Sequence, residues 1–226
     1  MPVSEFEREL EAYYEQHRNQ ELASRLEDLV RTMRRTLLLG AKYDELADES
    51  FSPNEETVTS VEEAKSLWEA NQFERLEDHL PDLDEGLKRE ENRVRGELQG
   101  VKHDLSEHLD GLESLNQRTN RISQSRIDDL RDELGELDTV STDSDGRFAE
   151  QEQSVQTHVR EHIVVELDNI EDELMEPFRG SGTTKHVHTL IDGDPIRLST
   201  LERDEIDELQ ETLGAHLSLQ LQGDES

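Results

Sequence analysis

Apolar residues recur along the chain at helical spacing, and the longest such stripe lies between Pro81 and Asp138. Steps of three and four residues separate most of its first apolar positions, which are Leu83, Leu87, Val94, Leu98, Val101, Leu105, Leu112, Leu115 and Ile122. The same rhythm continues, shifted by one residue, at Ile127, Leu130, Leu134 and Leu137. A narrow stripe of this length is typical of a coiled-coil seam. It predicts a long helix that needs a partner helix, from its own chain or from another copy.

The middle of this stretch leaves two arrangements open. Residues Ser114 to Ile127 contain no acidic residue and are rich in amides and hydroxyls, and the seam changes phase there. Either the helix continues with a local change of supercoil, or the chain turns and its two halves pack as an antiparallel hairpin. We favour the continuous helix because the segment lacks both Pro and Gly.

Two further helices are predicted before this stretch. Ser4 and Glu7 form a capping box for a first helix that reaches about Ala47. Residues 52–55 and 60–63 are alternative starts for a short second helix, and the second start is the better one. Pro81 suits the first turn of the long helix.

A third major helix is expected from about Ala149 to Phe178, after a loop at Thr139 to Arg147. Its apolar face matches the seam of the long helix and consists of Val155, Val159, Ile163, Leu167, Ile170 and Leu174. Because the loop is short, an antiparallel pairing of the two helices is the simplest way to bury both stripes.

The composition changes at the Pro177 to Gly182 joint. Beyond it we predict a ββαβ-like tail, with strands at 184–191, 196–198 and 216–221 and a helix at 201–213. The expected fold is therefore mostly α: an elongated helical bundle or antiparallel coiled coil with a small C-terminal α/β tail. The expected domains are 1–80, an N-terminal helical region; 81–178, a coiled-coil hairpin; and 179–226, the tail.

The composition is strongly acidic and poor in apolar residues. The chain has 57 acidic and 24 basic residues, a net charge of −33 and only 31% hydrophobic residues, so a large compact core is not expected. Lysine occurs only at positions 42, 65, 88, 102 and 185, and cysteine is absent. In these respects the sequence resembles the uncharacterised acidic coiled-coil proteins of haloarchaea. The resemblance implies that the acidity serves solvation in molar salt.

Several function classes are not expected. Without cysteine there are no disulfides, thiol nucleophiles or thiolate metal sites. No apolar run is long enough to span a membrane, and the first residues lack the pattern of a signal peptide, so we expect a cytoplasmic protein without a membrane partner.

Two histidine patterns resemble metal sites. His158, Glu161 and His162 fit HxxEH and so resemble the inverted zinc-peptidase signature, but the downstream ligand and the large domain of that family are missing. His186 and His188 would share one side of a strand near Asp192 and Asp194. We interpret both pairs as exposed or hydrogen-bonded histidines and predict no metal, no cofactor and no enzymatic activity.

Positive charge is concentrated in Val30 to Tyr43, which contains no acidic residue. These bases can pair with acids of a neighbouring helix while the leucines join a core, which we favour, or they can bind an acidic partner or a phosphate backbone. The candidate partner-binding residues are Arg31, Arg34, Arg35, Lys42, Arg118, Arg121 and Arg126.

The sequence thus predicts a non-enzymatic coiled-coil scaffold adapted to high salt, which binds protein partners and forms a homodimer through the coil. The alternative is a nucleic-acid-associated factor of the chromosome-maintenance kind that uses the basic helix.

Overall fold

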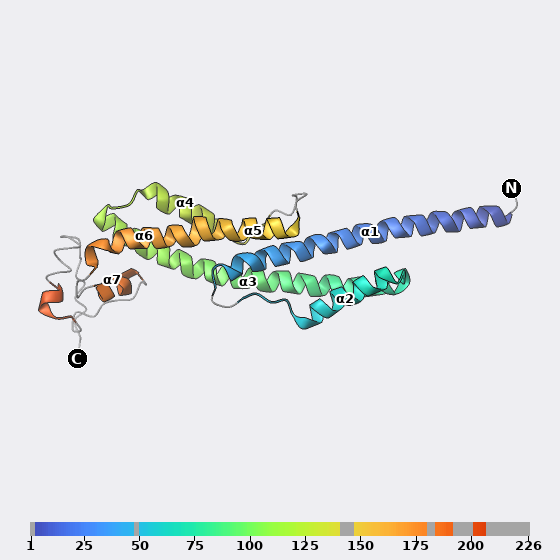
Figure 1. Cartoon of the computed structure of the whole chain (residues 1–226), viewed down its shortest axis with the longest axis horizontal. Helices are drawn as coiled ribbons and strands as arrows, with labels where there is room; N and C mark the ends of the chain where they lie inside the picture. The colour runs from blue at the N-terminus through green and yellow to red at the C-terminus, as the bar shows by residue number, and fades with distance from the viewer. Residues whose placement is uncertain (1–2, 48–49, 141–146, 180–183, 192–200, 207–226) are drawn as a thin grey trace, which may run out of the picture. The chain divides into compact units, whose positions relative to one another are not determined.

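The computed structural model describes residues 3–47, 50–140, 147–179, 184–191 and 201–206, with side chains described from Gln20 onward except that of Leu190. Its principal helices, shown in Figure 1, are α1 (Val3–Asp44), α2 (Glu55–Glu69), α3 (Phe73–Thr119), α4 (Gln124–Gly135), α5 (Phe148–Val159), α6 (Val165–Met175) and α7 (Thr184–Ile191). A π-helical turn (Arg160–Val164) joins α5 to α6, and a 3-10 turn (Glu176–Phe178) follows α6. The described residues contain no β-strand, which confirms that the protein is predominantly α-helical.

The chain divides into two compact units. The first comprises Met1–Gln99 and Asp138–Gln156, and the second comprises Gly100–Leu137 and Thr157–Ser226. Helix α3 contributes residues to both units, because the boundary at Gln99 falls inside it. The expected division at residues 80 and 178 stays a prediction.

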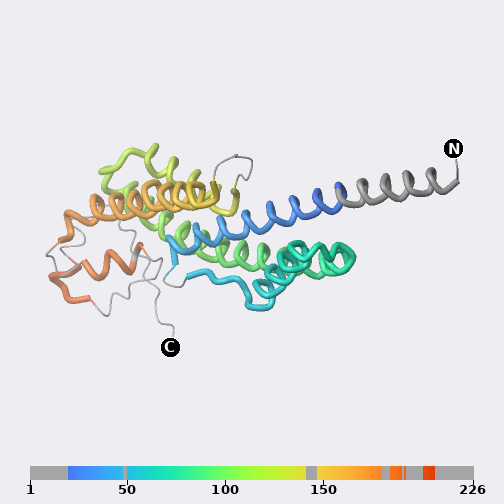
Figure 2. The backbone as a smooth tube through the Cα atoms, turned by 45° about the vertical axis from the view of Figure 1, so that its right-hand side comes forward, coloured from blue at the N-terminus to red at the C-terminus, as the bar shows by residue number. Residues whose placement is uncertain are grey.

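In the first unit, α1 and α3 run parallel and α2 runs antiparallel to α3, as the tube in Figure 2 shows. Thr57 of α2 faces Gly86 of α3, and Ser60 of α2 is hydrogen-bonded to His79, so the two helices pass in opposite directions. The shared core consists of Leu22, Leu29, Ala64, Leu67, Leu76, Leu80, Leu83 and Leu87. Helices α1, α2 and α3 are therefore packed up-down-up in the first unit.

The preferred start of the second helix and the predicted start of the long helix are wrong. Helix α2 begins at Glu55, which confirms the alternative start at 52–55 and not the one at 60–63. The side chain of Asn54 accepts a hydrogen bond from the backbone N–H of Glu56 at 2.9 Å and caps the helix there. Helix α3 begins at Phe73 and continues through Pro81. A proline inside a helix costs about 3 kcal/mol. Burial of the leucines on either side of it, each worth about 1.5–3 kcal/mol, offsets that cost.

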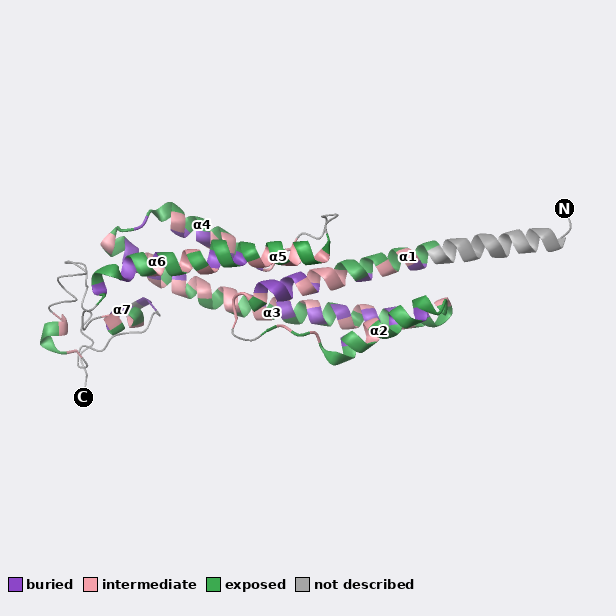
Figure 3. Cartoon of the chain, viewed as in Figure 1, coloured by how far each residue is buried: buried purple, intermediate pink, exposed green. Residues whose placement is uncertain are grey.

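The connection between α1 and α2 is held against α1 and α3 by one aromatic ring. The ring of Phe51 lies so close to Gly40 that a Cβ at Gly40 would be 2.3 Å from it, and the guanidinium of Arg93 lies 4.7 Å from the ring centroid. Arg93 also donates to the carbonyl of Ser52 at 2.7 Å. This end of α1 is buried at every position from Leu38 to Lys42, whereas nearer to Gln20 buried and exposed positions alternate (Figure 3).

In the second unit the predicted long helix is interrupted. Helix α3 ends at Thr119 and α4 begins at Gln124, so the continuous helix that we favoured is wrong and the antiparallel hairpin is confirmed. Asn120 adopts a left-handed conformation with φ of 49°, which ends the helix. The buried Asn116 side chain accepts from the backbone N–H groups of Arg121 and Ile122 and donates to the carbonyl of Ile122 at 2.9 Å. The hydrogen bonds of the Asn116 side chain thus stabilise a turn that contains neither Pro nor Gly.

The predicted helix from Ala149 to Phe178 is confirmed as the continuous series from α5 to the final 3-10 turn. Its second-unit part runs antiparallel to α4, since His158 pairs with Glu133 while Arg126 pairs with Glu166 and Glu173. The antiparallel pairing expected for this helix is thus made with α4. The partners of the seam come from the same chain, and its leucines and isoleucines from Leu112 to Leu137 are buried.

The prediction of a strand at 184–191 is wrong, because these residues form α7. Val187, Thr189 and Ile191 alternate as in a strand, but Val187 and Ile191 are also one helical turn apart, and both are buried. The backbone carbonyl of Ile191 approaches Gly111 of α3 so closely that a Cβ there would lie 1.8 Å from its oxygen. Packing on α3 therefore selects the helix. The predicted strands at 196–198 and 216–221, and most of the helix at 201–213, lie outside the described residues.

Gly111→Ala tests this close approach. A Cβ at position 111 would overlap the Ile191 carbonyl, so we expect displacement of α7, faster hydrogen exchange in 184–191 and a loss of about 1–3 kcal/mol. Gly100→Ala is the matched control, because a Cβ there meets nothing within 4 Å and alanine favours the helix by up to about 1 kcal/mol. Equal exchange and stability in the two variants would contradict the packing of α7 on Gly111.

Candidate functional site

The basic segment of α1 is largely used inside the first unit. Arg35 Nε lies 3.3 Å from Glu91 Oε1 of α3, and the buried Lys42 donates to the carbonyl of Thr139 at 2.7 Å. Arg31 is exposed and pairs with Asp28 one turn earlier, at 3.0 Å. Leu38 and Leu39 are fully buried. Arg35 thus meets an acid of a neighbouring helix and the leucines enter a core, as the structural interpretation of the segment expects, whereas Arg31 pairs within α1 and Lys42 bonds a backbone carbonyl.

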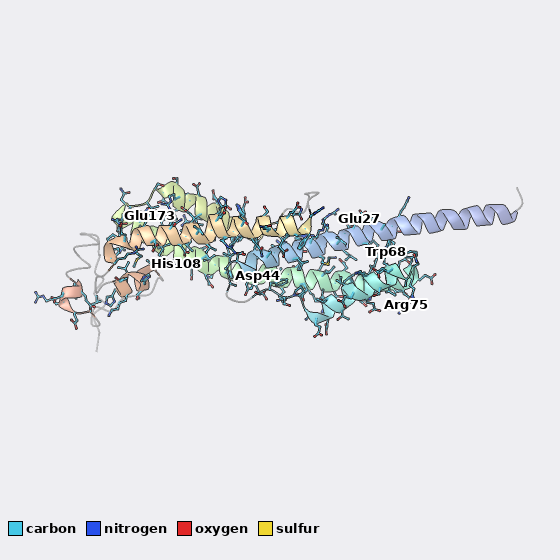
Figure 4. All side chains as sticks on the ribbon, viewed as in Figure 1. Glu27, Asp44, Trp68, Arg75, His108 and Glu173 are labelled. Atoms are coloured by element: carbon cyan, nitrogen blue, oxygen red, sulfur yellow. The ribbon has the colours of Figure 1, made fainter. Side chains whose placement is uncertain are left out.

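The second basic group lies at the α3–α4 turn and on α4, in the second unit. Arg126 forms ion pairs with Glu166 at 2.7 Å and Glu173 at 2.8 Å, both on α6. Arg121 donates to the carbonyl of Glu173 and pairs with Glu176 at 3.0 Å. The side chain of Glu173, labelled in Figure 4, belongs to this group of contacts. The hydrogen bonds that Arg126 donates to the carboxylates of Glu166 and Glu173 raise the pKa of Arg126, so it stays charged.

Arg131, which the sequence did not single out, joins α4 to α3. Its Nη2 atom donates to Asp110 Oδ1 and to Glu113 Oε2, both at 2.7 Å. Gln124 donates to the other oxygen of Glu113 at 2.8 Å. The hydrogen bond from Arg131, followed by that from Gln124, lowers the pKa of Glu113. A signal was present in the sequence, because Arg126 and Arg131 are the two bases of α4 and flank its buried Ile127 and Leu130.

Of the seven candidate partner-binding residues, Arg34 and Arg118 have no ion-pair or hydrogen-bond partner among the residues that the structure describes. Arg118 is exposed near the end of α3, and Arg34 is half-buried on α1. They belong to different units. The candidate residues therefore do not form one described site.

The HxxEH histidines form a local contact in the second unit. The rings of His158 and His162 lie with their centroids 4.6 Å apart and their planes inclined by 34°, and His158 Nε2 lies 2.8 Å from Glu133 Oε2. The π-helical turn from Arg160 to Val164 overlaps the second half of this motif. The arrangement is a hydrogen-bonded pair at the α4 contact, as we interpreted it.

His186 and His188 do not share a strand face, because they lie on helix α7 and contact different carboxylates. His186 is buried and lies 3.4 Å from Glu205, whereas His188 Nδ1 lies 3.5 Å from Glu171 Oε1. The other oxygen of Glu171 contacts His108 of α3 at 3.2 Å. Glu171 of α6 thus links α7 to α3. Asp192 and Asp194 lie outside the described residues.

Within the described ranges, no group of three or more His, Asp or Glu side chains is arranged to hold a metal ion. None of the described helices is long and apolar enough to cross a membrane. Comparisons with protein-family models, with curated proteins and with solved structures returned no match. The functional argument therefore rests on the chain's own residues.

Protonation of Glu113 should weaken the second unit. Because its pKa is lowered on folding, its contribution is complete at neutral pH and is lost as the pH falls through the folded-state value, below about 4.5. We expect Glu113→Gln to reduce the free energy of unfolding by about 0.5 kcal/mol at pH 7, as is usual for a partly exposed pair. The difference from the wild type should shrink in acid.

Urea unfolding at several pH values measures this effect. Asp129→Asn is the matched control, because Asp129 is an exposed carboxylate of the same α4 helix without an ion-pair partner among the described residues. A loss in Glu113→Gln that is the same at every pH would show that the ion pair with Arg131 is not its cause.

Proposed function

We propose that the protein is a non-enzymatic interaction scaffold that works at high salt and binds another protein. The observation that carries this proposal is α3, a single helix of 47 residues that supplies buried residues to both units. Leu76 to Leu98 pack in the first unit, and Leu109 to Leu115 pack in the second. One continuous helix thus contributes to two cores, a property suited to a scaffold for partner contacts.

The use of the basic residues also supports a scaffold. Arg35, Arg93, Arg126 and Arg131 each join carboxylates or carbonyls of different segments in their own unit. Their guanidinium groups are thus used in contacts between segments of the chain itself. Arg34 and Arg118 are the candidate residues left for contact with an acidic or amide-rich surface of the partner.

The same contacts make the nucleic-acid-associated alternative the weaker proposal. Phosphate binding needs several accessible cations, and it weakens steeply as salt rises. Arg31, Arg35, Lys42, Arg121 and Arg126 all have partners within the chain. The high net negative charge adds repulsion of the phosphate backbone.

Adaptation to high salt follows from the surface. The net charge of −33 is spread over a chain of 226 residues, so the carboxylates repel one another when salt is low. At about 1 M salt the Debye length is about 3 Å, and this repulsion is almost fully screened. The apolar cores of both units lose little of their stability under the same conditions.

Thermal unfolding should therefore shift upward with salt. We expect the Tm to rise continuously between about 0.1 and 3 M KCl, because screening removes the self-repulsion of the folded state. Each kcal/mol gained raises the Tm by about 2–4 °C for a chain of this size. Circular dichroism at a series of KCl concentrations measures the shift. A Tm that falls or stays constant over this range would contradict adaptation to high salt.

An interruption of α3 tests the scaffold itself. We expect insertion of Gly-Ser-Gly-Ser after Gln99 to leave the helical signal of both units nearly intact but to reduce partner binding, because the two cores are then no longer joined by one helix. The same insertion within 141–146 is the matched control, because the sequence predicts a loop there. Binding is measured by cross-linking in cell extract at about 3 M KCl.

The expected result is one protein captured by the wild type and the control but not by the Gln99 insertion. Equal capture by all three chains would contradict the role of α3. Retention of duplex DNA in place of protein would favour the nucleic-acid alternative.

A further inference from the structure

Helix α1 is apolar on two different faces. One face is apolar from Leu22 onward, and the other is apolar near the amino end of the helix. Leu22, Leu26, Leu29 and Met33 follow the three-four spacing of a helix face, and they pack on α2 and α3 in the first unit. Counting back by heptads, the same line passes through Asn19, Glu15, Ala12 and Arg8. The residues on this line before Leu22 are therefore polar or small.

The second line is apolar only near the amino end of α1. It runs through positions 3, 6, 10 and 13, which are Val, Phe, Leu and Tyr, and it reaches His17. Counted forward by heptads, it continues at Gln20, Ser24, Glu27 and Arg31, and all four are exposed. The labelled Glu27 can be found in Figure 4. In the described part of α1 this line is thus the face that the chain's own helices leave uncovered.

We propose that positions 3–17 of α1 form a parallel, two-stranded coiled coil with the same positions of a second copy of this chain. The alternating steps of three and four give a narrow seam, which one partner helix covers. Helix α1 is continuous from Val3 to Asp44, so the seam belongs to a helix that is already anchored in the first unit. A short seam on an anchored helix avoids the cost of nucleating a new helix.

The charges and the polar position favour a second copy in parallel register. The flanking positions that face each other in such a dimer pair Glu9 with Tyr14 and Gln16 with Glu21, so no two carboxylates are opposed. Parallel register pairs His17 with its equivalent, whereas an antiparallel pair would place it opposite Val3. A polar position paired with itself is a common determinant of register.

Salt controls this association. Two copies that each carry −33 repel at low ionic strength, and molar salt removes the repulsion while leaving apolar contacts intact. The assignment rests on the proposed scaffold function and names a second copy as one of its partners. It is tested by self-association alone, so its failure leaves the α3 insertion experiment unaffected.

The first test is the mass of the full-length chain in about 3 M KCl, measured by light scattering and sedimentation over a range of concentrations. We expect a wild-type dimer with twice the chain mass of 26.1 kDa. Phe6→Gln with Leu10→Gln should raise the dissociation constant by about tenfold or more. Glu5→Gln with Glu11→Gln, which lie outside the seam on the same helix, should not raise it.

Circular dichroism and the Tm separate loss of the dimer from loss of the fold. The four substituted positions precede Leu22, the first α1 residue of the first unit's core among those with described side chains, so each monomer should keep its helices. A wild type that remains monomeric throughout the micromolar range overturns the proposal. So does a dimer that the Phe6→Gln, Leu10→Gln variant forms as tightly as the wild type.

The second test is disulfide cross-linking through a single introduced cysteine, because the chain itself contains none. In His17→Cys the single thiol should form a disulfide between copies on mild oxidation, because parallel register places position 17 beside its equivalent. Ala12→Cys, on the opposite line of the same helix, should remain reduced under the same conditions. A cross-link only between Val3→Cys and His17→Cys chains would show antiparallel pairing and overturn the stated register.

Discussion

The need to bury the apolar stripe of α3 is the constraint on which the rest of the structure depends. A helix of 47 residues is about 70 Å long, and no single small core can cover it. The chain meets this need twice, with α1 and α2 in the first unit and with α4, α6 and α7 in the second. Each leucine so buried contributes about 1.5–3 kcal/mol. Because only 31% of the residues are hydrophobic, few further apolar side chains are available for burial elsewhere.

The few arginine side chains add ion pairs and hydrogen bonds to the apolar contacts between helices. Arg131 joins α4 to α3, Arg126 joins α4 to α6, and Arg93 fixes the α1–α2 connection. Each of them meets at least two oxygen atoms, a geometry that the planar guanidinium suits better than lysine does. Because carboxylates outnumber bases by more than two to one, each of these arginines can be shared between two acids. The excess of carboxylates therefore supplies the acceptors that these arginines share.

Two contacts, one at Gly111 and one at Asn116, decide local features that periodicity leaves ambiguous. At Gly111 the missing side chain lets the Ile191 carbonyl approach, and α7 becomes a helix where alternation suggested a strand. At Asn116 a buried amide satisfies the backbone of the turn that ends the first half of the seam. Neither position stands out in a list of apolar residues, since both act through the backbone of another segment.

The sequence by itself determined the helical class, the seam and the extent of the 149–178 helix, because three-four spacing and helix-forming residues are local properties. It also marked the acid-free segment at Ser114 to Ile127 as unusual, although Pro and Gly were the wrong signals for its turn. Only the tertiary structure decided that α3 runs through Pro81, that α4 folds back, and that Arg121 and Arg126 are engaged within the chain. These outcomes depend on which distant residues meet. Burial and pairing energies, which no local window contains, outweigh the local preferences.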